Sequence, residues 1–142
     1  IIKSFKPTSK KEFILNFDQF SNPLSITKSI EIVYGLRNFI GNANKFSRSK
    51  IFINIKSDSD TTEVVIEDDG EGYPNDVLRK IGEPYVRSYR SSTKSKSGLG
   101  LGIFIGKTLL EKNYANILCK NSQTRSGAEV SIKWNNKDLL NF

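Results

Sequence analysis

The stretch Asp68-Asp69-Gly70-Glu71-Gly72-Tyr73-Pro74 follows a strand-like run, and Gly98-Leu99-Gly100-Leu101-Gly102 comes about thirty residues later, before a helix-like run. Upstream of both lies Asn38-Phe39-Ile40-Gly41-Asn42-Ala43-Asn44-Lys45-Phe46, in a segment whose apolar residues recur at helical spacing. Each stretch alone is weak evidence, because glycines and asparagines are common wherever a chain turns. In this order and at these spacings, they predict one pocket for a nucleoside triphosphate and its magnesium ion.

In the first stretch, a carboxylate stands where a strand enters a glycine turn. Gly70 and Gly72 have no Cβ, so the backbone can bend sharply and approach a flat ring closely. Asp68 can then accept a hydrogen bond from an exocyclic amine, which adenine carries and guanine replaces by a carbonyl. The competing interpretation is a β-turn in which Asp68 caps backbone amides, and this stretch alone favours neither.

The second stretch places glycines directly before a helix. Backbone amides at a helix start form an anion site, and the missing side chains let phosphates come close. The alternative is a glycine pair that merely ends a loop, and the spacing is not that of the P-loop, G-x-x-x-x-G-K-[ST]. The nucleotide contacts expected here are Ser97, Gly98, Leu99, Gly100, Leu101 and Gly102.

Residues 82–98, before the second stretch, have no hydrophobic period and alternate serines with basic residues. This pattern predicts a mobile loop, and beside a phosphate pocket such a loop would serve as a lid over the ligand. Without a phosphate motif next to it, a plain disordered loop would be the preferred interpretation. Arg87 and Arg90 are the candidates for lid contacts with the nucleotide.

The upstream segment carries polar residues on one stripe of a helix whose other side faces a core. Asn38, Asn42 and Lys45 follow at intervals of four and three, so they share that stripe. The amide oxygen of Asn42 is a hard ligand suited to Mg²⁺, Asn38 can orient a metal-bound water, and Lys45 can reach a phosphate as a point charge. Phe46 can stack on the base. A solvated helix face is the alternative, preferred if the glycine stretches were absent.

Hydrophobic patterning predicts the order strand, helix, hairpin, short helix, lid, helix, hairpin. This order favours an α+β fold, a two-layer sandwich with a mixed sheet and about three helices on one face. In the last long helix, Leu101, Ile105 and Leu109 are expected on the buried side. A linker or frayed N-terminus is predicted at 1–12, the nucleotide-binding domain at 13–136 and a tail at 137–142. The expected strands are 12–17, 51–55, 63–68, 115–121 and 128–134, and the expected helices are 26–47, 75–81 and 100–112.

Composition removes several classes of function. The chain of 142 residues has no histidine, which excludes histidine-based catalysis and histidine metal sites within it. Its single cysteine, Cys119, cannot form an internal disulfide and is expected to be a small buried hydrophobe. The net charge of +7 is concentrated near the predicted lid, so a phosphate pocket explains it without nucleic acid. No stretch approaches the roughly 20 apolar residues of a membrane span. The absence of methionine suggests a piece of a longer protein.

The three motifs together resemble the ATP-binding (Bergerat) fold of sensor histidine kinases, type II topoisomerases, mismatch-repair ATPases and heat-shock chaperones. The asparagine helix is similar to that family's N box, residues 68–72 to its G1 box and residues 98–102 to its G2 box. Gly82-Glu83-Pro84-Tyr85 resembles the F box of the kinases, which implies a nucleotide contact for Tyr85. Gly127-Ala128-Glu129-Val130 resembles the closing motif before the last strand. The resemblance covers about residues 13–135.

Within this family the resemblance favours the kinase branch. ATPases of the family carry a water-activating glutamate one turn before the magnesium asparagine, where this chain has Asn38. Residues 32–36, 106–111 and Trp134 look like the RegB/PrrB redox-responsive sensor kinases, although Gly41 stands where an acidic residue is frequent. The resemblance implies transfer of the γ-phosphate of Mg-ATP to a histidine on a dimerisation domain outside this chain, then to a response regulator.

Further expectations follow from the same resemblance. The fragment is expected to be monomeric, not to phosphorylate itself, and to contact neither nucleic acid nor membrane. The parent is expected to be a homodimer anchored in the inner membrane, with this domain in the cytoplasm. The alternatives are an ATPase or serine-directed kinase of the same fold, a degenerate domain that only binds ATP, and a basic module that binds nucleic acid.

Overall fold

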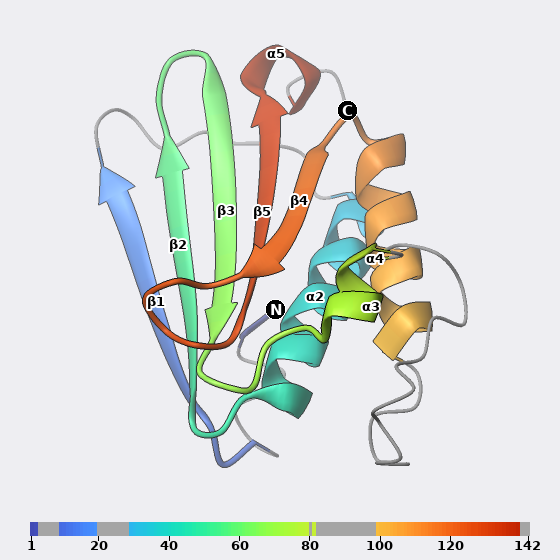
Figure 1. Ribbon diagram of the computed structural model, residues 1–142. Coiled ribbons are helices and arrows are strands. Elements are labelled where there is room, and N and C mark those ends of the chain that lie inside the picture. Colours follow the sequence, from blue (N-terminus) through green and yellow to red (C-terminus); the bar gives the residue numbers. More distant parts are fainter. Residues whose placement is uncertain (3–8, 20–28, 80, 82–98, 140–142) are drawn as a thin grey trace.

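Five strands form a single mixed sheet in the computed structural model, which describes residues 1–2, 9–19, 29–79, 81 and 99–139 (Figure 1). The strand order is β1-β2-β3-β5-β4, with β1 parallel to β2 and every other neighbouring pair antiparallel. Helices α2, α3 and α4 lie on one face, which confirms the predicted two-layer architecture. The element bounds are β1 (Glu12–Gln19), α2 (Ile30–Phe46), β2 (Lys50–Ser57), β3 (Thr61–Asp68), α3 (Asn75–Arg79), α4 (Leu99–Lys112), β4 (Asn116–Asn121), β5 (Ala128–Asn135) and α5 (Asn136–Leu139).

Alternation along the strands sends one set of side chains into the core under the helices. Ile53, Ile66 and Val130 are paired in register across β2, β3 and β5 and are all buried. Fully burying a side chain of this size contributes about 1.5–3 kcal/mol. Polar side chains of the same strands, among them Glu67 and Asn54, lie on the opposite face of the sheet. The helix side of the sheet therefore holds the core, and it is also the side to which Asp68 points.

Two glycines let α2 and α4 approach each other closely. A Cβ on Gly35 would lie 2.5 Å from Leu110 Cγ, and one on Gly106 would lie 2.8 Å from Phe39 Cε2. Both distances are shorter than real Cβ atoms show, so alanine at either point would force the facing side chain to shift. The antiparallel packing of the two helices places the asparagine stripe of α2, which is Asn38, Asn42 and Lys45, beside the start of α4.

The bounds of α2 are narrower than predicted. Ser29 is the N-cap, with extended backbone and a side-chain Oγ that accepts a hydrogen bond from Ile32 N at 3.3 Å. Serine is a favoured N-cap because its oxygen satisfies an amide of the first turn. The helix therefore begins at Ile30 rather than at residue 26, and it ends at Phe46, since Ser47 is again extended.

The buried faces of the two long helices also differ from the prediction. In α2, Ile30 is 70% exposed, although the helical spacing of apolar residues over 26–47 predicts that it faces the core. In α4, Ile105 is 37% exposed, while Ile103 and Leu110 are fully buried. The apolar residues of α4 occupy more than one stripe, so periodicity could not select the stripe that packs on α2.

The last turn of α4 explains why β4 begins one residue later than predicted. Tyr114 has a left-handed φ of 69°, and the Ala115 N–H donates to Leu110 O at 3.0 Å. This six-residue bond is the Schellman pattern that ends many helices. Ala115 therefore belongs to the helix cap, and the strand begins at Asn116.

Both ends of the described chain are attached to the domain. The expected tail 137–142 overlaps α5, in which Leu139 is 3% exposed, and residues 140–142 lie outside the described part. At the other end, Lys11 Nζ donates to the Asn44 carbonyl at 2.8 Å. These contacts place parts of the expected linker and tail on the folded body.

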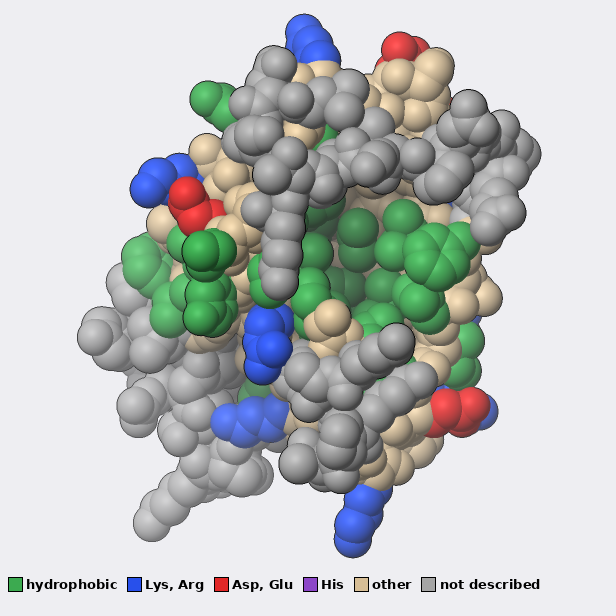
Figure 2. Space-filling view, turned by 180° about the vertical axis from the view of Figure 1, so that it is seen from behind, with side chains coloured by type: hydrophobic (Ala, Val, Ile, Leu, Met, Phe, Trp, Pro, Cys, Tyr) green, Lys and Arg blue, Asp and Glu red, His purple; other side chains and the backbone are tan. Residues whose placement is uncertain are grey.

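On the side opposite to the view of Figure 1, hydrophobic side chains line the floor of a hollow (Figure 2). At the edge of the sheet, Leu15 and Phe17 of β1 remain exposed, because β1 pairs only with β2. The described helices therefore leave the edge strand partly uncovered.

Candidate functional site

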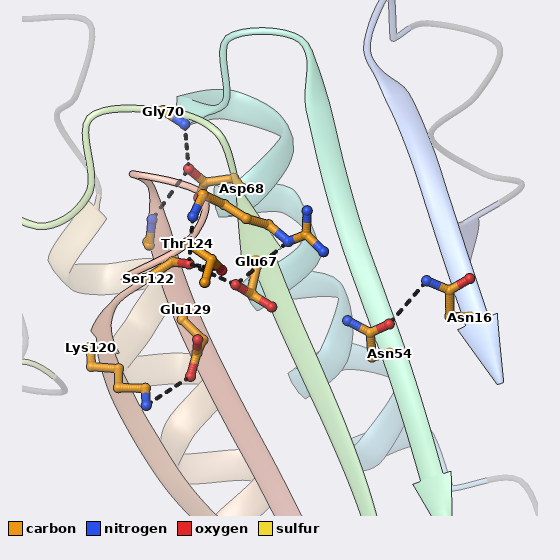
Figure 3. A network of polar contacts seen from close by, with 11 residues as sticks. Asn16, Asn54, Glu67, Asp68, Gly70, Lys120, Ser122, Thr124 and Glu129 are labelled. Atoms are coloured by element: carbon orange, nitrogen blue, oxygen red, sulfur yellow. Dashed lines mark hydrogen bonds and ion pairs between the residues drawn. The ribbon is translucent and has the colours of Figure 1, made fainter. Parts of the chain in front are cut away.

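Asp68 ends β3 with a buried carboxylate that is fixed by two backbone amides. Its side chain is only 4% exposed, and Oδ1 accepts hydrogen bonds from Gly70 N at 2.8 Å and Ala128 N at 3.3 Å (Figure 3). Burial raises the pKa of this carboxyl, and the amides of Gly70 and Ala128 oppose that rise. The carboxyl is therefore held in one orientation, as the amide-capping interpretation of the turn predicted.

Close backbone contacts around Asp68 require glycine at two positions. A Cβ on Gly70 would lie 2.2 Å from Phe46 O at the end of α2. A Cβ on Gly127 would lie 2.1 Å from Asp68 O. The turn after β3 is therefore pressed between the last residue of α2 and the β4–β5 turn, without room for a methyl group on either side.

Asp69 fastens the same turn to the loop after α2. Its Oδ1 accepts hydrogen bonds from the backbone amides of Arg48, Ser49 and Lys50, at 2.8, 3.0 and 3.2 Å. Burial alone would raise the pKa of Asp69, but these amides and the Ser49 hydroxyl outweigh it and lower the pKa to about 2. The side chain holds the end of α2 and the turn after β3 together.

The asparagine stripe of α2 lies against the start of α4. Asn42 Nδ2 is buried and, among the described residues, has no hydrogen-bond partner. A Cβ on Gly102 would lie 3.2 Å from Asn42 Oδ1, so the amide sits against the glycine-rich first turn of α4. Asn38, one turn earlier, donates from Nδ2 to Tyr34 O at 2.8 Å. The predicted magnesium ligand and the predicted phosphate turn are thus neighbours.

The other predicted residues of α2 lie at its C-terminal end. Lys45 is exposed, and its Nζ lies 5.4 Å from the centroid of the Phe46 ring. Phe46 is the last helical residue, and its carbonyl is the atom that Gly70 approaches. Lys45 and Phe46 therefore lie at the junction between α2 and the Asp68 turn.

Several predicted contacts cannot be placed. Leu99, Gly100 and Leu101 have helical backbone at the start of α4, and nothing is described of the two leucine side chains. The predicted lid falls outside the described residues, together with Tyr85, Arg87, Arg90, Ser97 and Gly98. The described residues contain no group of three His, Cys, Asp or Glu that could hold a metal ion. A magnesium site of one amide oxygen, waters and phosphates does not need such a group.

Sequence patterns did not reveal the residues that brace the turn after Gly72. Asn121, at the end of β4, accepts from Tyr73 N through Oδ1 at 2.6 Å and donates from Nδ2 to Tyr73 O at 3.0 Å. Behind this clamp, Tyr73 is buried beside Cys119, whose pKa is raised to about 11 by burial. Cys119 is half-buried and behaves as the expected small hydrophobe. An asparagine at a strand end gives no local signal for this role.

A polar network on the open face of the sheet supports the β4–β5 turn (Figure 3). Glu67 Oε2 accepts a hydrogen bond from Ser122 Oγ at 2.7 Å and lies 3.7 Å from Arg125 Nε. The Arg125 guanidinium also stacks 3.6 Å above the centroid of the Phe52 ring. This network holds the turn that delivers the Ala128 amide to Asp68 on the other face.

The open face also carries a concavity of about 450 Å³. Its lining includes Asn54, Glu63 and Glu67 but none of the predicted nucleotide-binding residues. Because Glu67 and Asp68 point to opposite faces of the sheet, this concavity is separate from the motif-bearing side. No helix in the described ranges is long and apolar enough to cross a membrane.

Comparisons of the sequence agree with the geometry. The family model described as histidine kinase-, DNA gyrase B-, and HSP90-like ATPase matches residues 27–138. The sensor histidine kinase RegB of Cereibacter sphaeroides is 37% identical over 124 residues, which are 77% of this chain and 27% of that protein. A putative NtrY-like sensor histidine kinase of Rickettsia felis is 29% identical over 129 residues, 90% of this chain and 20% of that protein. The chain thus spans about a quarter of these relatives or less.

Solved structures show the same fold. The mycobacterial sensor histidine kinase MprB matches with a TM-score of 0.74 at 21% identity, over 94% of this chain and 87% of that one. Full-length ShkA in complex with AMPPNP matches with a TM-score of 0.69 at 20% identity, over 93% of this chain and 27% of that one. The predicted resemblance to RegB-type kinases is confirmed by the 37% identity. The chain therefore belongs to the family of histidine kinase-, DNA gyrase B- and HSP90-like ATPases, and within it is similar to catalytic domains of sensor histidine kinases.

Proposed function

We propose that this chain is the ATP-binding catalytic domain of a two-component sensor histidine kinase. It binds Mg-ATP and presents the γ-phosphate to a histidine on a dimerisation domain outside this chain, from which a response regulator receives the phosphoryl group. The observation that carries the proposal is Asn42, whose buried Nδ2 has no partner among the described residues and whose Oδ1 adjoins Gly102. A buried polar group left unpaired is costly, so such a group suits a ligand site.

Asp68 would select the base. Two backbone amides already hold its Oδ1, which leaves the carboxylate oriented without a ligand. Accepting a hydrogen bond from the exocyclic amine of adenine then requires no reorganisation of the site, and the same carboxylate would face the carbonyl of guanine. Phe46, whose carbonyl adjoins Gly70, would stack on the base.

The phosphates would lie between α2 and the first turn of α4. Backbone amides at the start of α4, where Gly102 leaves room, suit an anion. The Asn42 amide oxygen would hold Mg²⁺, and Lys45 would contact a phosphate as a point charge. Bound Mg²⁺ supplies charge neutralisation of the phosphates. The contribution of this chain is positioning, which can account for much of the rate of a phosphoryl transfer.

The residue one turn before Asn42 argues against a hydrolase. Asn38 is an amide rather than a carboxylate, so it cannot take a proton from water as a general base. Its Nδ2 is engaged by Tyr34 O, which fixes the side chain along the helix. The alternatives are an ATPase or serine-directed kinase of the same fold, and a degenerate domain that binds ATP without transferring it.

The context of the domain follows from the proposed function. The ShkA structure with AMPPNP supports binding of an ATP analogue by this fold. The domain would be cytoplasmic and monomeric when isolated, within a homodimeric parent anchored in the inner membrane. It would have no contact with nucleic acid.

The test is a calorimetric titration of the chain with AMPPNP, with and without Mg²⁺, beside Asp68→Asn. The variant keeps an oxygen for the amides of Gly70 and Ala128, so its unfolding temperature should stay close to that of the wild type. Losing a charged hydrogen bond of about 1.5–3 kcal/mol should weaken binding roughly 10- to 150-fold. The guanine analogue serves as the control for selectivity. Equal binding of both analogues, or equal binding by both proteins, would contradict the adenine assignment.

A second experiment separates kinase from hydrolase. Incubation with labelled ATP should release phosphate at the background rate. Adding a separate histidine-bearing dimerisation domain of a RegB-type kinase should give label on that domain. Steady phosphate release by the chain alone would favour the ATPase.

A further inference from the structure

The residue just before β1 is tied to the end of α2 by its side chain. Lys11 Nζ donates to Asn44 O at 2.8 Å, to Ser47 O, and to Ser47 Oγ at 3.2 Å. Ser9 reinforces this contact, because its Oγ donates to Asn44 Oδ1 at 2.6 Å and accepts from Lys11 N at 3.1 Å. The ammonium group thus binds several carbonyl and hydroxyl oxygens at the C-terminal end of a helix, where a positive charge is favoured.

The same helix end carries residues of the proposed nucleotide site. Lys45 and Phe46 lie in this last turn, and Asn42 lies one turn earlier. The Phe46 carbonyl contacts the Gly70 backbone, and Asp69 holds the amides of the following loop. The last turn of α2 is therefore held from two sides, by Lys11 and by the turn that begins at Asp68.

Lys11 also acts on Asp68 through its charge. Burial raises the pKa of the Asp68 carboxyl, the amides of Gly70 and Ala128 lower it, Asp69 raises it and Lys11 lowers it. The charge of Asp68 in turn raises the pKa of the buried Tyr73 hydroxyl, after burial and Cys119. Among the described residues that shift the pKa of Asp68, the cation is Lys11, so its loss changes the electrostatics of the carboxyl that would bind adenine.

We propose that Lys11 is a positioning residue for nucleotide binding, because its ammonium group holds the last turn of α2 against the Asp68 turn. This inference rests on the proposed ATP site. Residues 9–11 form the last described segment before β1. The bonds of Lys11 would therefore make nucleotide affinity depend on the position of the segment through which the chain enters the domain. Displacing this segment would loosen Lys45 and Phe46 and weaken binding.

The test compares Lys11→Met with Lys10→Met in titrations with Mg-AMPPNP. Both variants remove one positive charge, but Lys10 is exposed and lies on the neighbouring position. We expect Lys11→Met to bind about tenfold more weakly and Lys10→Met to stay within about twofold of the wild type. Lys11→Arg, which keeps the charge, should recover much of the affinity.

The pH profile provides a readout that a purely structural role would not move. Ionised Asp68 accepts the adenine amine more strongly than the protonated acid does, so binding weakens as pH falls through its pKa. Without the Lys11 charge that pKa rises further, so the acid decline of Lys11→Met should begin at higher pH than that of the wild type and Lys10→Met.

The outcomes are separable from those of the proposed function. A wild-type chain that does not bind AMPPNP contradicts the nucleotide site itself. A wild type that binds, with Lys11→Met within about twofold of it and an unshifted pH profile, overturns the role of Lys11. If Lys11→Met does not fold, Lys11→Gln replaces it, because that change removes the charge and keeps amide donors for the oxygens of Asn44 and Ser47. Binding about two- to threefold weaker then supports the proposal, and unchanged binding overturns it.

Discussion

Gly127→Ala tests how tightly the β4–β5 turn is pressed on Asp68. A methyl group at this position would lie 2.1 Å from Asp68 O and 2.2 Å from Asp68 Oδ1, where real Cβ atoms essentially never come under 3.0 Å. The obstructing atoms include backbone and an anchored carboxylate, so they cannot rotate away as the end of a flexible side chain would. The turn must move by about an ångström, which separates it from β3.

The expected loss of stability follows from the contacts that this movement breaks. Overpacking of a close-packed site costs about 1–3 kcal/mol. The bonds from Ala128 N to Asp68 Oδ1 and from Ser122 N to Gly127 O would lengthen, at about 0.5–1.5 kcal/mol each. Together these losses come to roughly 2–6 kcal/mol, and about 3 kcal/mol lowers the unfolding temperature of a chain of this size by about 10 °C.

The assay is thermal and urea unfolding of Gly127→Ala beside Gly35→Ala. At Gly35 the added methyl meets the Leu110 side chain, whose Cγ lies 2.5 Å away, and alanine favours the helix by about 1 kcal/mol. We therefore expect Gly35→Ala to lose less stability than Gly127→Ala and to weaken Mg-AMPPNP binding less. The reasoning fails if the unfolding free energy of Gly127→Ala lies within about 0.5 kcal/mol of that of the wild type.

Three other predictions concern single side chains. The pKa of Asp69 is lowered from 3.8 to about 2, so its stabilisation is present above about pH 4 and is lost as pH falls toward 2. In urea unfolding, the difference in unfolding free energy between Asp69→Asn and the wild type should shrink over that range, and a constant difference would contradict this. Cys119, with a pKa raised from 9.0 to about 11, should react with iodoacetamide near pH 8 about 100-fold more slowly when folded than when denatured; native rates within about tenfold would refute this. Glu67→Gln weakens a buried charged hydrogen bond and should destabilise the fold by about 1–3 kcal/mol. Glu129→Gln removes the partly exposed pair with Lys120 and should change stability by less than about 1 kcal/mol; equal effects in denaturant unfolding would be evidence against the network.

The order of elements could be predicted because its signals are local. β2 and β5 alternate along their own length, and the glycine turns mark where β3 ends and α4 begins. The buried face of α4 could not be predicted, because the helix is apolar on more than one side. What selects the packed stripe is Gly106, whose missing side chain admits Phe39 of α2. A residue without a side chain contributes nothing to a hydrophobic pattern.

The candidate site was predictable only where the motif residues themselves meet. Asn42 lies against Gly102 as the spacing implied, and Asp68 stands at the glycine turn. The groups that hold these residues in place come from far along the chain. Asn121 bonds to Tyr73 across 48 positions, and Lys11 reaches the end of α2 across more than 30. Only the folded arrangement of sheet and helices brings such partners together.

Glu67 and Asp68 are consecutive residues at the end of β3, and each makes contacts on a different face of the sheet. Successive side chains of a strand point to opposite faces, so Asp68 faces the helices and Glu67 faces the open side. On the open side, Glu67 holds Ser122 and Arg125 and thereby sets the β4–β5 turn. From that turn, the Ala128 amide donates a hydrogen bond to Asp68 on the helix side. The orientation of the proposed adenine-binding carboxylate is therefore determined in part from the face that carries none of the predicted ligand residues.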